Sequence, residues 1–244
     1  TTEIYTLSLH DALPICRKVE RDEYLRRIDG LVYGTDPREG YFAGSTFYHP
    51  EMRFQFNFPS GWQTVNQKQG VIGVSEQQDA IIQITLAQGN SAGEAARQFF
   101  AQQGITGGSP QATQINGLDA VSSNFSAQTE GGQLQGTAAF VSYGSNVFQI
   151  IGYGTAAQWN ANRDNVNRAI GSFARLTDQS RINVEPRRVE IVTTSRSMTI
   201  EEFNRSNPSS VPLAELALIN QVELNERIPS GTMVKRVVGT APGR

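Results

Sequence analysis

The clearest hydrophobic pattern in the chain is a run in which aromatic and polar residues alternate. From Arg53 to Phe58 the sequence reads RFQFNF, so its three phenylalanines share one face and its polar side chains share the other. This period of two predicts a half-buried strand, and Pro59-Ser60-Gly61 predicts the turn that ends it ahead of Trp62. We expect the surrounding segment 47–73 to organise the main domain.

The pattern downstream predicts more strands, a helix and a series of hairpins. The stretch 80–87 (AIIQITLA) is nearly continuously apolar, which predicts a central strand. Ser91 and Glu94 have the spacing of a capping box, and apolar residues then recur at helical spacing up to Phe100. Turn residues such as Asn116-Gly117 separate the later strands. The further predicted elements are strands at 70–75, 112–115, 118–129, 134–143 and 147–153, and a helix at 156–176.

The two ends of the chain predict smaller elements. A charged helix is predicted at 17–28, ended by Gly30, with an ordered connector at 31–44. The C-terminal part predicts a strand within 186–194, a capping box at Thr199–Glu202, a short helix at 213–219 and a strand at 228–238. Antiparallel strands with helices set apart predict an α+β fold: a sandwich of sheet and helices, then a small βααβ module.

Composition excludes several classes of function. The 244 residues carry 21 Lys and Arg against 23 Asp and Glu, so no basic field predicts nucleic-acid binding. No apolar run approaches the ~18 residues that a membrane span needs. The single cysteine, Cys16, excludes an internal disulfide and leaves the compartment open.

The first fifteen residues, TTEIYTLSLHDALPI, resemble a translated sequencing adapter. Translation of the adapter's first fifteen codons gives these fifteen residues in order. The next base of the adapter is T, and both cysteine codons begin with T, so the junction falls inside the codon of Cys16. We therefore exclude 1–15 from the fold and exclude His10 and Asp11 as site residues. The natural N-terminus is then expected to lie upstream, and the lack of a signal peptide says nothing about localisation.

No constellation of residues predicts an active site. A zinc peptidase motif needs two histidines one helical turn apart, and outside the adapter the chain has only His49. His49 has no identifiable triad partner, and we interpret it as structural or surface. Asp36 and Glu39 are interpreted as a solvated turn rather than an acid pair. We interpret Lys235-Arg236 as a solvated strand end rather than a ligand clamp.

Two further candidates carry no chemistry either. Gly104, Gly107 and Gly108 lack the lysine and the strand-to-helix setting of a phosphate-binding loop. Cys16 lies at the adapter junction and is not a credible nucleophile. No catalytic, cofactor-binding or metal-binding residue is assigned.

Several sequence blocks resemble one family, the bacterial extracytoplasmic zinc metallopeptidases of the gluzincin type, related to CAAX-prenyl proteases and BepA-like proteases. The resemblance covers about 17–239 and corresponds to the region after the catalytic domain. It implies that the H-E-x-x-H motif, the third glutamate ligand and the zinc lie in a missing upstream domain, and that the protein is periplasmic or extracytoplasmic. The blocks are Tyr24–Gly34, Pro37–Gly40, Phe47–Pro50, Arg53-Phe54, Phe58–Trp62, Asn66–Gln69, Met198–Asn204 and Lys235–Gly239.

Two further resemblances lie within this one. Segment 46–177 resembles a PsbP-type α/β/α sandwich, a fold used for protein docking. Segment 198–238 resembles a LysM module, a type that binds N-acetylglucosamine glycans. This copy has Ser195-Arg196-Ser197 in place of the usual leading Gly-Asp-Thr turn, so a plain packing role stays open beside glycan binding.

These observations predict six segments and two alternative functions. The first hypothesis is a non-catalytic accessory region that positions substrate or envelope partners for the upstream zinc metalloendopeptidase domain. The alternative is a stand-alone module that binds peptidoglycan or protein, and a self-contained enzyme is disfavoured. The predicted segments are an adapter at 1–15, an exit helix and connector at 16–45, a PsbP-like domain at 46–177, a linker and first strand at 178–194, a LysM-like module at 195–239 and a tail at 240–244.

Overall fold

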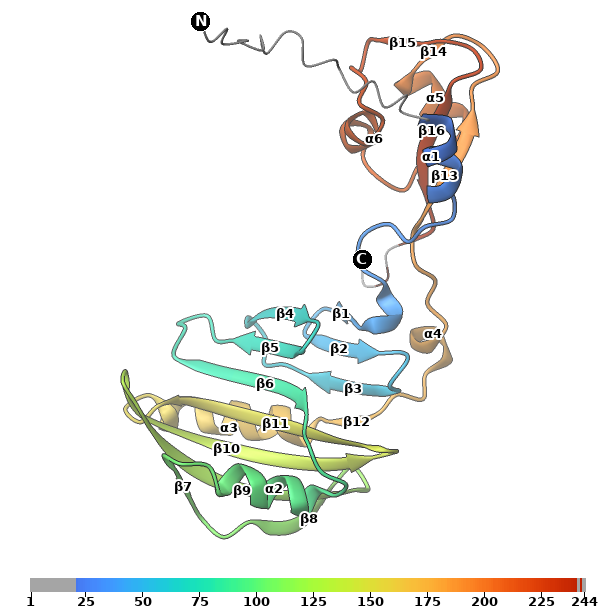
Figure 1. The fold of residues 1–244 in the computed structure, drawn as a ribbon. Helices are drawn as coiled ribbons and strands as arrows, with labels where there is room; N and C mark the ends of the chain where they lie inside the picture. Colours follow the sequence, from blue (N-terminus) through green and yellow to red (C-terminus); the bar gives the residue numbers. More distant parts are fainter. Residues whose placement is uncertain (1–20, 241, 243–244) are drawn as a thin grey trace, which may run out of the picture. The chain divides into compact units, whose positions relative to one another are not determined.

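The computed structural model describes residues 21–240 and residue 242, and these form two compact units (Figure 1). We call Pro37–Glu185 the central unit, and Arg21–Asp36 together with Pro186–Thr240 the terminal unit. The predicted adapter 1–15 and Cys16 lie outside the described residues.

The central unit is built on an eight-stranded sheet, the main sheet, whose neighbouring strands all run antiparallel. The apolar strand at its middle, β6, pairs with β5 on one side and β11 on the other, which confirms its predicted central place. In sheet order the strands are β4 (Gln63–Gln67), β5 (Gly70–Val74), β6 (Ala80–Leu86), β11 (Asn146–Thr155), β10 (Gly132–Tyr143), β9 (Leu118–Thr129) and β7 (Ile105–Gly107), with β8 (Gln111–Ile115) also on β9.

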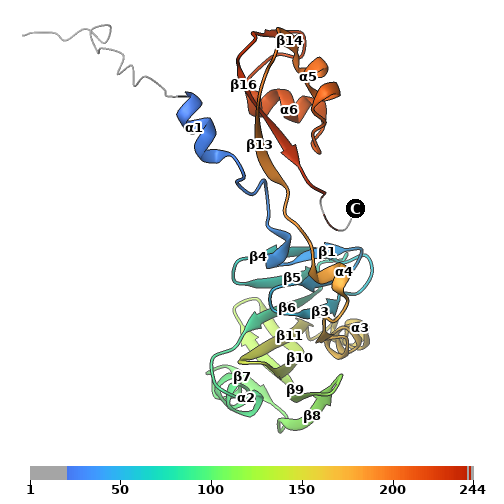
Figure 2. The same ribbon diagram turned by 90° about the vertical axis from the view of Figure 1, so that its right-hand side faces the viewer.

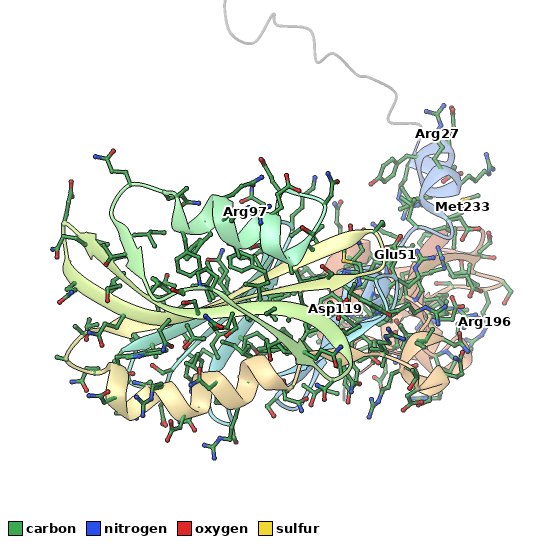
Figure 3. All side chains as sticks on the ribbon, turned by 90° about the horizontal axis from the view of Figure 1, so that it is seen from below. Arg27, Glu51, Arg97, Asp119, Arg196 and Met233 are labelled. Carbon is green, nitrogen blue, oxygen red and sulfur yellow. The ribbon has the colours of Figure 1, made fainter. Side chains whose placement is uncertain are left out.

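Helices cover the two faces of this sheet. Helix α2 (Ala92–Phe100) packs on β9 and β10 through a cluster of small and aromatic residues that includes Ala95, Phe99 and Phe140. Helix α3 (Trp159–Gly171) packs on the opposite face, as the view from below shows (Figure 3). The strand β10 is therefore buried on both faces, with Ala138 to Val141 all at 0% exposure.

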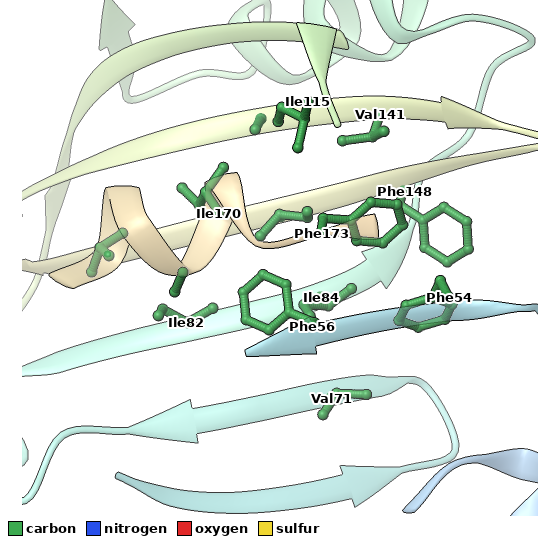
Figure 4. Packing of buried hydrophobic residues seen from close by; sticks show 14 of the residues in the cluster. Phe54, Phe56, Val71, Ile82, Ile84, Ile115, Val141, Phe148, Ile170 and Phe173 are labelled. Atoms are coloured by element: carbon green, nitrogen blue, oxygen red, sulfur yellow. The ribbon is translucent and has the colours of Figure 1, made fainter. Parts of the chain in front are cut away.

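A second, four-stranded sheet shares the face of α3. Its order is β1 (Tyr41–Ala43), β2 (Thr46–His49), β3 (Phe54–Asn57) and β12 (Ala174–Arg175). The three phenylalanines of the predicted aromatic strand are buried in the same cluster as Phe148 and Phe173, which confirms their shared inward face (Figure 4). Fully buried aromatic side chains such as these contribute several kcal/mol each to a core.

The terminal unit is assembled from both ends of the chain. Strands β13 (Arg188–Thr193) and β16 (Met233–Val238) form an antiparallel pair. The helices α5 (Ile200–Ser206) and α6 (Leu213–Asn220) lie on one side of it and α1 (Arg21–Ile28) on the other (Figures 1 and 2). A second pair joins β14 (Met198–Thr199) and β15 (Arg227–Ile228).

The segment after α1 is bonded along β13 and so becomes part of the same sheet. Gly30 N donates to Val189 O at 2.8 Å, and Val189 N donates to Leu31 O at 2.8 Å. Tyr33 extends the contact to α6, because its hydroxyl donates to Glu215 Oε1 at 2.7 Å. These bonds place residues 21–36 with the C-terminal segment, whereas the sequence analysis grouped them with 37–45 as an exit helix and connector.

Of the two predicted capping boxes, one forms completely and the other only in part. At α5 both bonds of the capping box form: Glu202 N donates to Thr199 Oγ1, and Thr199 N donates to Glu202 Oε2. At α2 the Ser91 hydroxyl accepts from Glu94 N as predicted, but the Glu94 carboxylate accepts from Asn90 N instead of Ser91 N.

Some elements differ from the predictions for local reasons. The helix predicted at 156–176 is shorter, because Phe173 leaves it and β12 turns to pair with β3. The strand predicted at 228–238 is divided at Pro229–Thr232, where Gly231 adopts a positive φ of 79°. The linker predicted at 178–194 contains the short helix α4 (Gln179–Ile182) as well as β13. The connector predicted at 31–44 holds the turn Pro37–Glu39 and β1.

Candidate binding site

Two loops of the terminal unit lie side by side and are joined by hydrogen bonds. We call residues 194–197 and 223–232 together the loop pair. Thr194 joins them: it is 3% exposed, its hydroxyl donates to Pro229 O at 2.7 Å, and its backbone N–H donates to Thr232 O at 2.9 Å. Gly231 N in turn donates to Thr194 O at 2.8 Å, so the two loops form a fixed platform.

Side-chain bonds extend the same contact outward. Ser230 Oγ donates to Ser195 O at 3.0 Å, and Arg227 donates to Ser197 O at 3.3 Å. The Ser195-Arg196-Ser197 tripeptide, which replaces the Gly-Asp-Thr turn, is exposed. The opposite loop holds the backbone carbonyls of Ser195 and Ser197, and all three side chains are exposed to solvent.

The surface of the loop pair carries mixed charge and one apolar side chain. Arg196 and Arg227 lie close enough to Glu202 to help lower the pKa of its carboxyl, although the bond from Thr199 N is the larger cause. Leu224 is 51% exposed on the second loop. Exposed hydroxyls, charged groups of both signs and one apolar side chain are groups that can bind a polar ligand.

His49 is half-buried at the border of the aromatic cluster of the central unit. Its Nδ1 accepts a hydrogen bond from Met52 N at 3.2 Å, and its ring lies 5.3 Å from that of Phe54. Burial lowers the pKa of the imidazole, with the charge of Glu51 acting the other way. A ring that is neutral and already accepts through Nδ1 fits a structural role.

This environment gives His49 a measurable pH signature. Because its folded pKa is lowered, the unfolded chain takes up the proton first as the pH falls below the ordinary value of about 6.5. The contribution of neutral His49 to the free energy of unfolding is therefore complete above a pH of about 6.5, and it is lost as the pH falls toward the pKa of the folded state. The free energy of unfolding should therefore decrease as the pH is lowered from 7.5 to 5. We expect His49→Asn to remove the part of this decrease that comes from the imidazole. Identical slopes for the two proteins would show that His49 does not titrate differently in the folded state.

The other residues considered from the sequence are dispersed. Lys235 and Arg236 are half-buried in the middle of β16, so their interpretation as a solvated strand end is wrong. Arg236 pairs with Glu190 of β13 at 2.7 Å, and burial lowers the pKa of Lys235. Gly107 lies in β7 against Phe100, where a Cβ would come within 2.6 Å of the ring. None of these residues joins the loop pair.

Glu39 ends the turn Pro37–Glu39, and its backbone carbonyl accepts from Asn66 Nδ2. Within residues 21–240 no group of three His, Cys, Asp or Glu side chains could hold a metal ion. No helix among them combines the length and apolar character needed to cross a membrane.

Sequence reasoning missed the contact that makes the loop pair. Thr194 and Thr232 lie 38 residues apart, and no local pattern relates them. The available signal was the Ser230-Gly231 dipeptide, which is typical of a turn but does not indicate the partner of that turn.

The scan against known protein families finds no match, and the search of curated proteins finds none. Among solved structures the chain is similar to cyanobacterial PsbP (CyanoP) from Synechocystis, with 14% identity, a TM-score of 0.45 and coverage of 58% of this chain and 98% of that one. It is also similar to LpqN, involved in cell envelope biogenesis of Mycobacterium tuberculosis, with 14% identity, a TM-score of 0.43 and coverage of 64% and 96%.

A third similar structure comes from Bacteroides thetaiotaomicron, with 16% identity, a TM-score of 0.44 and coverage of 83% of this chain and 88% of that one. These are partial similarities of fold between chains of low identity. None of them assigns an activity, a ligand or a partner to this chain. The α+β class itself is confirmed by the antiparallel sheets and packed helices described above.

Proposed function

We propose that this chain is the non-catalytic accessory region of an extracytoplasmic zinc metalloendopeptidase, and that it holds substrate or envelope partners near a catalytic domain upstream. The observation that carries the proposal is the place of α1. The block Tyr24–Gly34, part of the resemblance to that peptidase family, is bonded into the terminal unit beside β13. A domain that precedes Arg21 would therefore be joined directly to the unit that carries the loop pair.

The described residues, 21–240, do not fit the zinc itself. The described residues bring no three metal-ligating side chains together, and the Nδ1 of His49 is already engaged with Met52 N. The proposal accordingly places the zinc with the upstream motif. What it assigns to this chain is binding: a tethered site raises the local concentration of a partner around the catalytic domain without new chemistry.

The test compares a parent protein, recovered by amplifying upstream of the Arg17 codon, with its catalytic domain alone. We expect zinc and casein cleavage in both. Removal of 17–244 is expected to raise the KM for casein about tenfold or more, and to leave kcat for a short peptide unchanged. Residues 17–244 alone should bind no zinc. An unchanged KM, zinc bound by 17–244, or no H-E-x-x-H motif upstream would each count against the proposal.

A second function, binding to peptidoglycan, is favoured by the loop pair itself, because it exposes the side chains of Ser195 and Ser197 on one loop and Leu224 on the other. The test is sedimentation with purified cell-wall sacculi. If this function is right, Leu224→Ser should reduce the bound fraction, whereas Leu86→Ser, at a matched 49% exposure in the central unit, should not. A protein that stays in the supernatant would exclude it.

A further inference from the structure

The first strand of the main sheet has an outer edge that no other described strand occupies. Strand β4 (Gln63–Gln67, QTVNQ) pairs with β5 and ends the sheet order. Natural sheets usually block such an edge with charges, prolines or bulges. This strand has no charged residue and no proline, and its register with β5 is continuous from Gln63 to Gln67.

The edge borders an apolar strip on the sheet face that carries α2. A row of directly paired residues crosses the sheet from Val65 of β4. It runs through Ile72 of β5, Gln83 of β6 and Ile151 of β11 to Ala138 of β10. Ala138 packs among the residues under α2, so this row lies on the face that α2 covers. Residues directly opposite each other point to one face, so Val65 also points to that face. Helix α2 lies over β9 and β10, at the other end of the sheet from β4 (Figure 2).

The strip is apolar but only partly covered. Val65 is 45% exposed, and Ile72, Val74 and Ile81 are half-buried on the same face. On the other face the side chain of Asn66 donates to Gly40 O at 3.1 Å and is held toward the small sheet. The exposed middle of the edge is therefore an aliphatic side chain, next to a strip of the same character.

The strand is complementary to itself. If two copies pair antiparallel about Val65, the two valines lie opposite each other, Gln63 faces Gln67, and Thr64 faces Asn66. The nearest charged residue, Lys68, then falls opposite Trp62 of the second copy and not opposite another lysine. Opposed apolar and amide side chains support cross-strand pairing, while opposed like charges would weaken it.

We propose that β4 is a homodimer edge, at which a second copy of this chain pairs β4 antiparallel about a two-fold axis through Val65. The pairing joins two eight-stranded sheets into one and merges the two apolar strips. An isologous contact of this kind closes after two copies. A single short strand pair buries less than a standard interface, so the dimer is expected to dissociate on dilution. The inference does not depend on the peptidase proposal.

The direct test is a cross-link at the axis. In a Cys16→Ser background, oxidised Val65→Cys is expected to run as a disulfide-linked dimer, because opposite residues in an antiparallel pair lie about 4.5–5.5 Å apart at Cα, within disulfide range. Ile72→Cys is the matched control: it lies on the same face but one strand inward. Two copies of residue 72 would be about 14 Å apart, and no cross-link should form. Equal cross-linking of both variants, or of neither, would overturn the proposal.

The equilibrium test uses sedimentation of the unaltered protein over a range of concentrations. We expect a monomer–dimer equilibrium whose Kd rises at least about tenfold in Val65→Lys, which places two lysines at the axis. Gln83→Lys, in the same row but inside the sheet, should leave the Kd unchanged. An unaltered protein that stays monomeric at every concentration overturns the proposal and leaves the edge to a foreign extended peptide.

Discussion

Leu25→Ala is expected to unfold the terminal unit at denaturant concentrations that leave the central unit intact. Leu25 is 2% exposed in α1, which packs on β13 and β16. Removing a buried leucine side chain costs about 2–5 kcal/mol, and a unit of this size has little stability in reserve. The expected result is a separate, early transition in circular dichroism.

The two tryptophans make the result easy to assign. Trp62 and Trp159 both lie in the central unit, so tryptophan fluorescence reports that unit alone. Its midpoint should not move in Leu25→Ala, while amide exchange in β13 and β16 accelerates. Tyr24→Ala, at a neighbouring position with 57% exposure, is the control and should leave both transitions in place. A single coincident transition that shifts as a whole would show that the units unfold together.

Phe56→Ala is expected to destabilise the central unit and to leave the terminal unit unchanged. Phe56 is 0% exposed, and its ring lies 4.8 Å from that of Phe58. Truncating a buried phenylalanine leaves a cavity that costs about 3–5 kcal/mol. The expected result is a lower midpoint in tryptophan fluorescence, with the transition of the terminal unit unmoved.

Asn57→Ala provides the comparison on the same strand. The Asn57 side chain is exposed, and the bond that this residue makes to Ser172 Oγ comes from its backbone N–H, which alanine keeps. Its effect should stay within about 0.5 kcal/mol. Equal effects of the two substitutions would mean that the aromatic cluster does not carry the stability of this sheet.

The sequence predicted well wherever a periodic pattern reports burial. The alternation at Phe54, Phe56 and Phe58 identified an inward face because one side of β3 is buried and the other is not. The capping box at Thr199 was found because all of its parts lie within four residues. In such cases the local pattern and the tertiary structure agree.

The prediction failed where the structure depends on distant partners. Strand β4 has the sequence of a polar loop, and it is a strand because β5 pairs with it. The segment 30–33 looks like a connector, and its place beside β13 depends on residues about 160 positions later. The loop pair likewise depends on hydrogen bonds between residues that are far apart in the sequence. Candidate binding surfaces built from long-range hydrogen bonds therefore leave no periodic trace in one sequence.

The split construction of the terminal unit has a consequence for synthesis on the ribosome. Arg21 donates to Met233 O across 212 residues of chain, so α1 is made long before its partner strand. At about 5–20 residues per second, Leu25 waits roughly 10–40 s for the strand it packs against. During that interval the central unit can fold, while the Leu25 side chain still lacks the strands that bury it. The terminal unit closes only after the last strand has left the exit tunnel.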